Sequence, residues 1–279
     1  MQPPQTGQPI GVFDSGIGGL SILAALRAEL PGEHFFYFSD AGHAPYGERG
    51  DDFVVARSRA IARMLVETRG IKALVVACNT ATAAAIHQLR ADWPALPLIG
   101  VEPALKPAAA VTRTGHVGVL APRGTLASAK FRALHDGLSG VARFHLVACD
   151  GLAHAIERND AARIDLLAAR YLGALKALSA DTGQIDTLVL GCTHYAFATV
   201  ALRRYASAGL RFIDTGAPVA QQTRRLLAAR NALHDGPGAL TLETSGAPGT
   251  LHLAAARWLS VSALSSSLEP ATAEASHAN

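Results

Sequence analysis

The chain has few of the features that mark membrane, secreted or nucleic-acid-binding proteins. Among its 279 residues, no apolar run approaches the roughly 18 residues that a membrane helix needs. The opening stretch, MQPPQTGQP, contains neither a basic segment nor an apolar one, so we expect no signal peptide. Lysine and arginine exceed aspartate and glutamate by only three, 25 − 22. So small a surplus, spread along the chain, predicts no nucleic-acid surface.

Cysteine is scarce as well. The chain has three, Cys78, Cys149 and Cys192, and this odd, sparse set does not describe a secreted disulfide scaffold. No Cys-x-x-Cys and no His/Cys cluster has the spacing of a zinc site, and no lysine has a Schiff-base context. The sequence therefore predicts a cytoplasmic protein with free thiols, no metal and no cofactor.

What the chain does contain is a regular alternation of strand-like and helix-like segments. Hydrophobic residues make up 49% and charged residues 17%, as in a globular protein with a full core. The strand candidates are residues 10–13, 35–38, 74–77, 96–101, 117–120, 144–148, 188–190, 211–213 and 240–243. Amphipathic helix candidates include residues 17–30, 53–68, 80–90, 161–179 and 217–230. This alternation predicts an α/β fold with mainly parallel sheets.

Two ten-residue stretches can be superimposed without a gap. Residues 71–80 read IKALVVACNT and residues 185–194 read IDTLVLGCTH, so that Cys78 falls on Cys192. Each is a short β-branched run that ends in a small residue, a cysteine and polar side chains, which is typical of a buried parallel strand. The carboxyl end of such a strand is where ligands bind in open α/β sheets. A thiol on either side of one substrate suits a reaction whose substrate and product are mirror images.

This internal repeat predicts two similar lobes, each a mainly parallel sheet flanked by helices, with the active site between them. We expect the first lobe, which carries Cys78, to comprise residues 1–102 and 214–259. The second lobe, which carries Cys192, comprises residues 103–213. The final strand and helix would then rejoin the first lobe. Residues 260–279 are rich in serine and alanine and poor in large apolar groups, so we expect a disordered tail.

The two cysteines at matching strand ends are the strongest candidates for catalysis. Cys78 precedes a predicted helix, whose N-terminus would lower the pKa of the thiol. The alternative for either cysteine is a buried, inert position in the core, but their shared pattern favours function. His194 lies two residues beyond Cys192, where it can polarise a substrate carboxylate or assist the thiol.

Other strand ends carry weaker candidates. Asp14 and Ser15 precede three glycines whose spacing is not the dinucleotide fingerprint, and no Walker lysine follows. These two residues either bind an ammonium or carboxylate group or simply cap the next helix. Tyr46 and the amide of Gly47 lie in a loop that either holds a ligand or is an ordinary turn. Cys149 is followed by aspartate and glycine, and we expect a structural role for it.

Several of these segments together resemble one family. They are GVFDSGIGGLSIL (11–23), FSDAGHAPYG (38–47), VVACNTATA (75–83), GVEPALKPA (100–108), LVLGCTHY (188–195), FIDTGAPVA (212–220) and TSGAP (244–248). Their combination and order are similar to those of the glutamate racemases, within the cofactor-independent aspartate/glutamate racemase superfamily. The resemblance extends from residue 10 to about residue 258 and is specific as a set, although each segment alone is weaker.

The resemblance implies a mechanism and a set of site residues. Cys78 and Cys192 match the two catalytic thiols, which act on opposite faces of the substrate α-carbon. The residues that match the substrate-binding set are Asp14, Ser15, Pro45, Tyr46, Gly47, Asn79, Thr80, Thr125, Thr193 and His194. Glu157 matches an auxiliary glutamate near the site, although most carboxylates at a helix start are simply solvated. The resemblance also implies the function: an enzyme that interconverts L- and D-glutamate and supplies D-glutamate for peptidoglycan. It further implies that the enzyme is a homodimer.

The chain departs from the family pattern in a few places. Pro122 and Ala196 replace a common threonine and a common proline, Asp150 follows Cys149 in place of a proline, and residues 41–43 differ. These changes leave both thiols in place and bear on which acidic amino acid fits. One alternative is therefore a racemase of another acidic amino acid such as aspartate. The other is a non-catalytic module that binds an acidic ligand or a protein, against which the presence of both cysteines argues.

Overall fold

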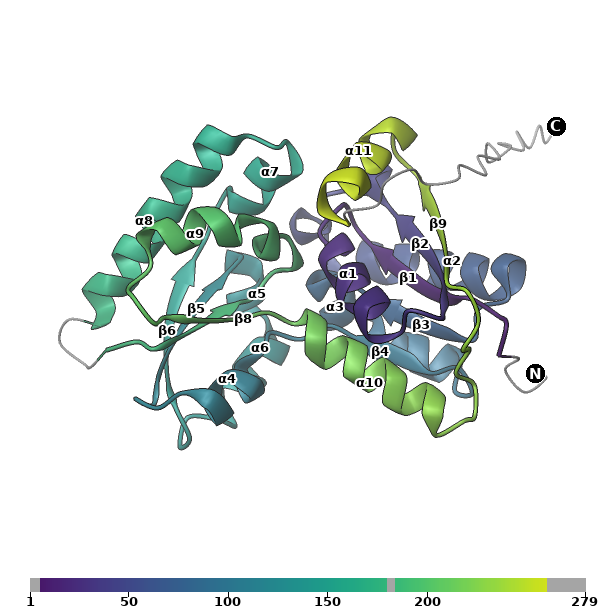
Figure 1. Ribbon diagram of the computed structural model, residues 1–279, viewed down its shortest axis with the longest axis horizontal. Coiled ribbons are helices and arrows are strands. Elements are labelled where there is room, and N and C mark those ends of the chain that lie inside the picture. Colours follow the sequence, from purple (N-terminus) through teal and green to yellow (C-terminus); the bar gives the residue numbers. More distant parts are fainter. Residues whose placement is uncertain (1–5, 180–183, 260–279) are drawn as a thin grey trace.

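Two separate parallel sheets form the centre of the molecule, each with helices on both faces (Figure 1). The structure is a computed structural model that describes residues 6–179 and 184–259. The predicted disordered tail, residues 260–279, lies outside the described residues. The predicted class, two parallel sheets flanked by helices, is confirmed.

The first sheet has five strands in the order β4-β3-β1-β2-β9, and all neighbours are parallel. Its strands are β1 (Ile10–Asp14), β2 (His34–Ser39), β3 (Ala73–Val76), β4 (Leu98–Gly100) and β9 (Ala239–Thr244). Strands β1 and β3 are fully buried along their length, since helices cover both faces of the sheet. Burial on both faces explains why these strands read as continuous apolar runs rather than as alternating ones.

The second sheet has four parallel strands in the order β6-β5-β7-β8. These are β5 (His116–Ala121), β6 (Arg143–Ala148), β7 (Thr187–Leu190) and β8 (Arg211–Ile213). The order repeats the β2-β1-β3-β4 portion of the first sheet, so β3 and β7 occupy corresponding positions. Cys78 and Cys192 therefore follow corresponding strands, as the superimposed stretches predict. Among the described residues, the edge strand β9 has no counterpart in the second sheet.

Helices of the first half form two layers. One face of the sheet packs against α1 (Leu20–Glu29), α10 (Gly216–Ala228) and α11 (Pro248–Trp258). The other face packs against α2 (Asp51–Arg69) and α3 (Asn79–Asp92). Helix α2 has Asp51 and Asp52 in its first turn, which complement the helix dipole, and ends at Gly70, whose φ of 57° closes the helix in the left-handed region.

The second half has the same layered arrangement. One face of its sheet is covered by α7 (Leu152–Glu157), α8 (Ala161–Ser179), α9 (Thr199–Tyr205) and the 3₁₀ helix η3 (Thr193–Ala198). The other face carries α4 (Leu105–Val111), α5 (Arg123–Ala127) and α6 (Ala129–Asp136). Two further 3₁₀ helices, η1 (Ala41–His43) and η2 (Tyr46–Glu48), lie in the loop after β2.

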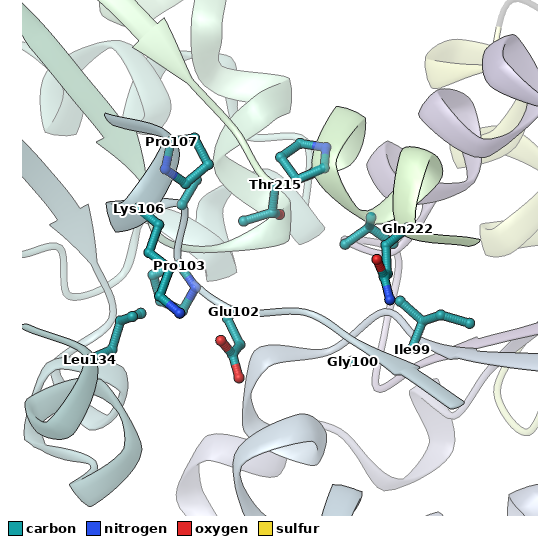
Figure 2. Close-up of a pocket in the computed structure, with 12 residues that line it drawn as sticks. Ile99, Gly100, Glu102, Pro103, Lys106, Pro107, Leu134, Thr215 and Gln222 are labelled. Carbon is teal, nitrogen blue, oxygen red and sulfur yellow. The ribbon is translucent and has the colours of Figure 1, made fainter. Parts of the chain in front are cut away.

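The chain passes between the two sheets twice. It leaves the first sheet after Gly100 and returns after Ile213, where α10 begins to pack on α1. A small cavity of about 190 Å³ lies at these crossings; Figure 2 shows Glu102 and Pro103 from the first crossing, and Thr215 and Gln222 from the second. We propose that one lobe comprises residues 1–102 and 214–259 and the other comprises residues 103–213. Within the described ranges, no helix is long and apolar enough to cross a membrane.

Candidate active site

The carboxyl ends of both sheets line one cavity of about 1010 Å³. Both halves of the molecule contribute to it, through the loops that follow β1, β2 and β3 and those that follow β5, β6 and β7. All of the residues singled out by motif and resemblance lie on its wall: Asp14, Ser15, Pro45, Tyr46, Gly47, Cys78, Asn79, Thr80, Thr125, Glu157, Cys192, Thr193 and His194. The structure thus brings together the residues that the sequence suggested separately, while their roles stay predictions.

Cys78 is buried at the end of β3, where it caps the N-terminus of α3. Its Sγ accepts a hydrogen bond from the amide of Ala81, at 3.4 Å, and lies 3.5 Å from the Oγ of Ser15. Burial raises the pKa of the Cys78 thiol to about 12, and the nearby charge of Asp14 contributes to this increase. The helix N-terminus lowers this pKa as predicted, through the amide of Ala81, but the net shift is upward. The hydrogen bonds from Ala81 and Ser15 do lower it, but loss of solvation outweighs them.

Cys192 lies in different surroundings, half-buried and followed directly by η3. Its Sγ is 3.7 Å from the Nδ1 of His194, and the Nε2 of His194 is 2.6 Å from the Oε2 of Glu157. Burial by itself lowers the pKa of His194, but the hydrogen bonds with Cys192 and Glu157 raise it well above its ordinary value. The resulting chain of thiol, imidazole and carboxylate favours a proton on the imidazole, with Glu157 accepting from Nε2.

Asp14 organises the glycine-containing turn between β1 and α1. Its Oδ2 accepts hydrogen bonds from the amides of Gly16, at 3.2 Å, and Gly19, at 2.8 Å, and burial raises its pKa. Gly18 of the same turn lies against His194, and a Cβ at Gly18 would clash with the imidazole. Asp14 thus binds amides within the turn, but neither it nor Ser15 caps α1, whose N-cap is Gly19 without a side-chain cap. The turn also brings the two halves into close contact beside the cavity.

A buried carboxylate holds the loop after β2. The side chain of Asp40 accepts hydrogen bonds from the hydroxyl of Tyr46, at 2.6 Å, and from the Nη2 of Arg57, at 2.7 Å. The Oγ of Ser245, in the loop after β9, donates to the same carboxylate at 2.7 Å. The hydroxyl of Tyr46 is thus occupied within the protein, and burial raises its pKa. The amide of Gly47, on the cavity wall, stays the candidate for ligand binding in this loop, since the carbonyl of Pro45 accepts from the amide of Glu48 at 3.5 Å.

Sequence reasoning missed Asp40 and Arg57, which support the site from outside the cavity wall. The sequence did contain a signal for Asp40: it directly follows the buried strand β2, much as Asp14 is the last residue of the buried strand β1. Arg57 lies within α2, and no local pattern distinguishes it from the other arginines of that helix. Its bidentate contact with Asp40 arises only from the packing of α2 beside the loop.

Two further features of the cavity concern ligand binding. The Oδ1 of Asn79, a residue of the cavity wall, is buried at the start of α3 and has no hydrogen-bond partner among the described residues. At the rim, Arg123 pairs with Asp150 at 2.6 Å and Lys130 pairs with Glu102 at 2.9 Å. These ion pairs were not anticipated from the sequence, since they connect residues on different elements.

Cys149 also reaches the cavity wall. It is buried at the end of β6, its Sγ lies 3.5 Å from the carbonyl oxygen of Val147, and its own carbonyl accepts the hydroxyl of Tyr195 at 3.2 Å. Burial raises the pKa of its thiol. The three cysteines are free thiols in the structure.

A pair of similar parallel sheets, each presenting one strand-end thiol to a common cavity, defines a class of racemase. The sequence pattern of the Asp/Glu/Hydantoin racemase family matches residues 20–223, and the chain belongs to this family. The resemblance indicated by the motifs is thereby confirmed.

Within that family, glutamate racemases are among the similar proteins. The chain is 50% identical over 229 residues to a glutamate racemase of Pseudomonas putida, with 82% of this chain and 85% of the relative covered. It is 47% identical to one from Stutzerimonas stutzeri, covering 86% and 89%. Among solved structures, glutamate racemase RacE1 of Bacillus anthracis has a TM-score of 0.80 at 31% identity, covering 92% of this chain and 96% of that one.

A second solved structure adds information on ligands. The glutamate racemase of Escherichia coli, in complex with L-glutamate and the activator UDP-MurNAc-ala, has a TM-score of 0.77 at 31% identity. The alignment covers 90% of this chain and 95% of that chain.

Proposed function

We propose that this protein is a glutamate racemase, which interconverts L- and D-glutamate by proton transfer between two thiols and supplies D-glutamate for peptidoglycan. One observation carries the proposal: Cys78 and Cys192, at corresponding strand ends of two similar sheets, line the same cavity. Identities of about 47–50% to glutamate racemases over most of the chain support glutamate as the substrate.

In the proposed reaction, one thiolate removes the α-proton and the opposite thiol delivers a proton to the other face. The α-carbon holds the electron pair in between, and each turnover exchanges the protonation states of the two cysteines. The surroundings suit one starting state in particular. Burial raises the pKa of Cys78 to about 12, so this thiol is protonated at neutral pH. The proton acceptor of this state is then Cys192, whose Sγ lies 3.7 Å from the Nδ1 of His194.

That starting state removes the proton on the Cys192 side and donates on the Cys78 side. By resemblance to the family, this is the direction from L- to D-glutamate. The carbanion-like intermediate is stabilised by the polar groups that surround it and by exclusion of water from the site. In this proposal the Oδ1 of Asn79, which has no hydrogen-bond partner among the described residues, accepts from the substrate ammonium group. The hydroxyls of Thr80, Thr125 and Thr193 are candidates for the carboxylates.

The decay of circular dichroism of L- and D-glutamate, measured with dialysed protein, tests this function. Decay with both enantiomers of glutamate and slower decay with aspartate is the expected result. Faster decay with aspartate would favour the racemase of another acidic amino acid. No decay with either substrate would overturn the enzymatic function and leave a module that binds an acidic ligand or a partner. Activity that persists in EDTA and without pyridoxal phosphate is expected, because the sequence shows no zinc spacing and no Schiff-base lysine.

The proposal extends to the setting of the enzyme. We expect it to act in the cytoplasm, where thiols stay reduced, and to form a homodimer with a complete active site in each protomer. Sedimentation across the micromolar range tests the dimer, and a purely monomeric protein would contradict it.

A further inference from the structure

An aromatic stack joins the two halves of the molecule close to Cys192. Phe197 of η3 stacks on Trp258, the last residue of α11, with ring centroids 4.4 Å apart and planes inclined by 17°. Helix α11 packs on the first sheet through buried residues such as Leu251 and Ala255, whereas η3 follows β7 of the second sheet. The stack therefore links the element that follows one thiol to the half of the molecule that carries the other thiol.

The segment η3 is held by contacts with both halves; within its own half, the buried Tyr195 donates to the carbonyl of Cys149 at 3.2 Å. This segment is a 3₁₀ helix, a geometry with poor internal hydrogen bonds, and the side chain of Cys192 does not cap its start. Phe197 is part-buried and packs against the apolar cores of both halves. A second contact holds the other end, where the Oγ of Ser21 in α1 donates to the carbonyl of Thr193 at 2.9 Å. Both ends of η3 are thus fixed to the first half of the molecule.

Cys78 is held quite differently. It caps α3, a regular α-helix of its own half, through the amide of Ala81. Movement of η3 would therefore displace Cys192 and His194 while leaving the contacts of Cys78 within its own sheet and helix unchanged. Such a movement would therefore disturb proton transfer at the substrate face that Cys192 serves more than at the face that Cys78 serves.

We propose that Phe197 and Trp258 are positioning residues for the reaction, because their stack fixes η3 and with it the Cys192 thiol and the His194 imidazole relative to Cys78. The inference rests on the proposed function. A stacked aromatic pair stabilises its contact beyond the burial of its area, which biases the placement of a short segment. Misplacing a reacting group by about 1 Å can lower a rate about a hundredfold.

The test compares Trp258→Leu with Trp93→Leu, the same substitution at the other tryptophan. Trp93 caps the C-terminal end of α3, packs on the opposite face of the first sheet and is not part of the cavity wall. For Trp258→Leu we expect kcat of racemisation to fall about tenfold or more with KM within about twofold. Trp258→Phe, which keeps a stacked ring, restores most of the rate, and Trp93→Leu keeps kcat within about twofold of wild type.

A second readout separates positioning from stability. With L- or D-β-chloroglutamate, a thiolate takes the α-proton, the electron pair forms the Cα=Cβ bond and chloride leaves; the enamine then hydrolyses to 2-oxoglutarate and ammonium. Only the deprotonating thiol is needed. Trp258→Leu should slow elimination from the enantiomer that Cys192 deprotonates more than elimination from the other enantiomer. Phe197→Leu, which leaves α11 intact, should show the same difference between the enantiomers. The double variant should be no slower than either single one.

Three results would overturn the inference: full activity in Trp258→Leu, an equal loss in Trp93→Leu, or an equal loss for both enantiomers that follows the folded fraction in thermal unfolding. Wild-type protein that does not racemise glutamate would instead contradict the proposed function. The two failures are therefore distinguishable.

Discussion

Cys78 and Cys192 follow corresponding strands of two similarly ordered sheets, yet their surroundings differ. Cys78 is buried, caps a helix and has a pKa raised to about 12 by loss of solvation. Cys192 is half-buried and adjoins an imidazole that is hydrogen-bonded to a carboxylate. The repeated strands place the two thiols symmetrically, whereas the loops that follow them do not repeat.

The difference teaches that a reaction with mirror-image substrates does not require a mirror-image site. The overall equilibrium between enantiomers is fixed at one, so unequal surroundings change the two proton transfers and not their ratio at equilibrium. In the proposed reaction, the thiol of the first half starts as the proton donor. In the second, His194 and Glu157 keep a charged pair beside the thiol. Each half-reaction then has its own dependence on pH.

The largest expected effect comes from removing either thiol. Cys78→Ser and Cys192→Ser keep the shape of the site but replace each thiol with a much weaker acid, so racemisation should fall at least about a thousandfold in both. Elimination from L- or D-β-chloroglutamate needs only the thiol that removes the α-proton. Each variant should therefore keep elimination from one enantiomer and lose it from the other. Cys78→Ser should keep elimination from the L form, and Cys192→Ser from the D form.

Coupled assays for 2-oxoglutarate on both enantiomers measure this pattern. Loss of elimination from both enantiomers in both variants would show that the thiols do not each serve one face. An exchanged pattern would keep the two-thiol mechanism and reverse only the assignment of faces.

The next effect concerns stability and the end of the first sheet opposite the cavity. There Lys72 and Glu33 form a buried ion pair at 2.6 Å, and the Nζ of Lys72 also donates to the carbonyls of Thr6 and Ala232. Lys72→Met leaves a buried carboxylate unpaired and should lower the free energy of unfolding by about 3–5 kcal/mol. Urea denaturation measures the change. Arg63→Met, at an exposed ion pair of α2, is the control and should cost less than about 0.5 kcal/mol; equal costs would contradict the expectation.

A smaller effect should come from Glu157→Gln, which removes a negative charge from the surroundings of Cys192 and His194. The carboxylate raises the pKa of His194 by favouring its charged form, so the substitution should lower that pKa. We expect kcat to fall about tenfold, and the pH limb of kcat/KM that reports His194 to move to lower pH. Histidine titration by NMR checks the shift directly. Asp150→Asn, at the rim of the same cavity, is the matched control; a limb that moves in both variants or in neither would refute the assignment.

The smallest effect is expected at Asp186, which directly precedes β7 and binds the segment before β5 at the start of the second sheet. Its carboxylate accepts from the Oγ1 of Thr112, at 2.6 Å, and the amide of Arg113, at 2.7 Å. Burial raises the pKa of Asp186, but these hydrogen bonds lower it to about 2. Because the folded pKa lies below the ordinary value, the stabilisation is complete above about pH 4 and is lost as the pH falls towards 2.

Asp186→Asn should therefore cost about 1 kcal/mol of unfolding free energy at pH 7. The difference between wild type and variant should shrink between pH 4 and pH 2. Urea titrations at pH 7, 4 and 2.5 measure it. A difference that stays constant across this range would show that the charge of Asp186 does not contribute.

Much of this fold could be predicted from the sequence because parallel strands are buried on both faces and read as short apolar runs. The predicted segments at 74–77 and 188–190 correspond to β3 and β7, and the position of each cysteine follows from them. Long helices such as α2 and α8 were also expected. The short helices α5, α6 and α7 were not, since they have one or two turns and are held by tertiary contacts rather than by their own periodicity.

The candidate site was predictable at strand ends and less so elsewhere. Cys78 and Cys192 could be identified because one motif occurs twice, and a resemblance supplied Thr125 and Glu157. The contact of Glu157 with His194 spans 37 residues of sequence and has no local signal. The net upward shift in the pKa of Cys78 was not predicted, because helix position can be inferred from a motif but the depth of burial cannot. The Phe197–Trp258 stack likewise depends on how two separate halves meet.

The position of the edge strand β9 in the sequence affects the order in which the two halves can fold during synthesis. The first sheet begins with β1 at residue 10, but its last strand ends at Thr244, and the helices α10 and α11 that cover one of its faces are also late in the chain. The second sheet, β5 to β8, is continuous in sequence. At about 5–20 residues per second, roughly ten seconds of translation separate Gly100 from β9. The half that emerges first from the ribosome is thus completed last, and it is during this delay that its exposed apolar face is most open to a chaperone.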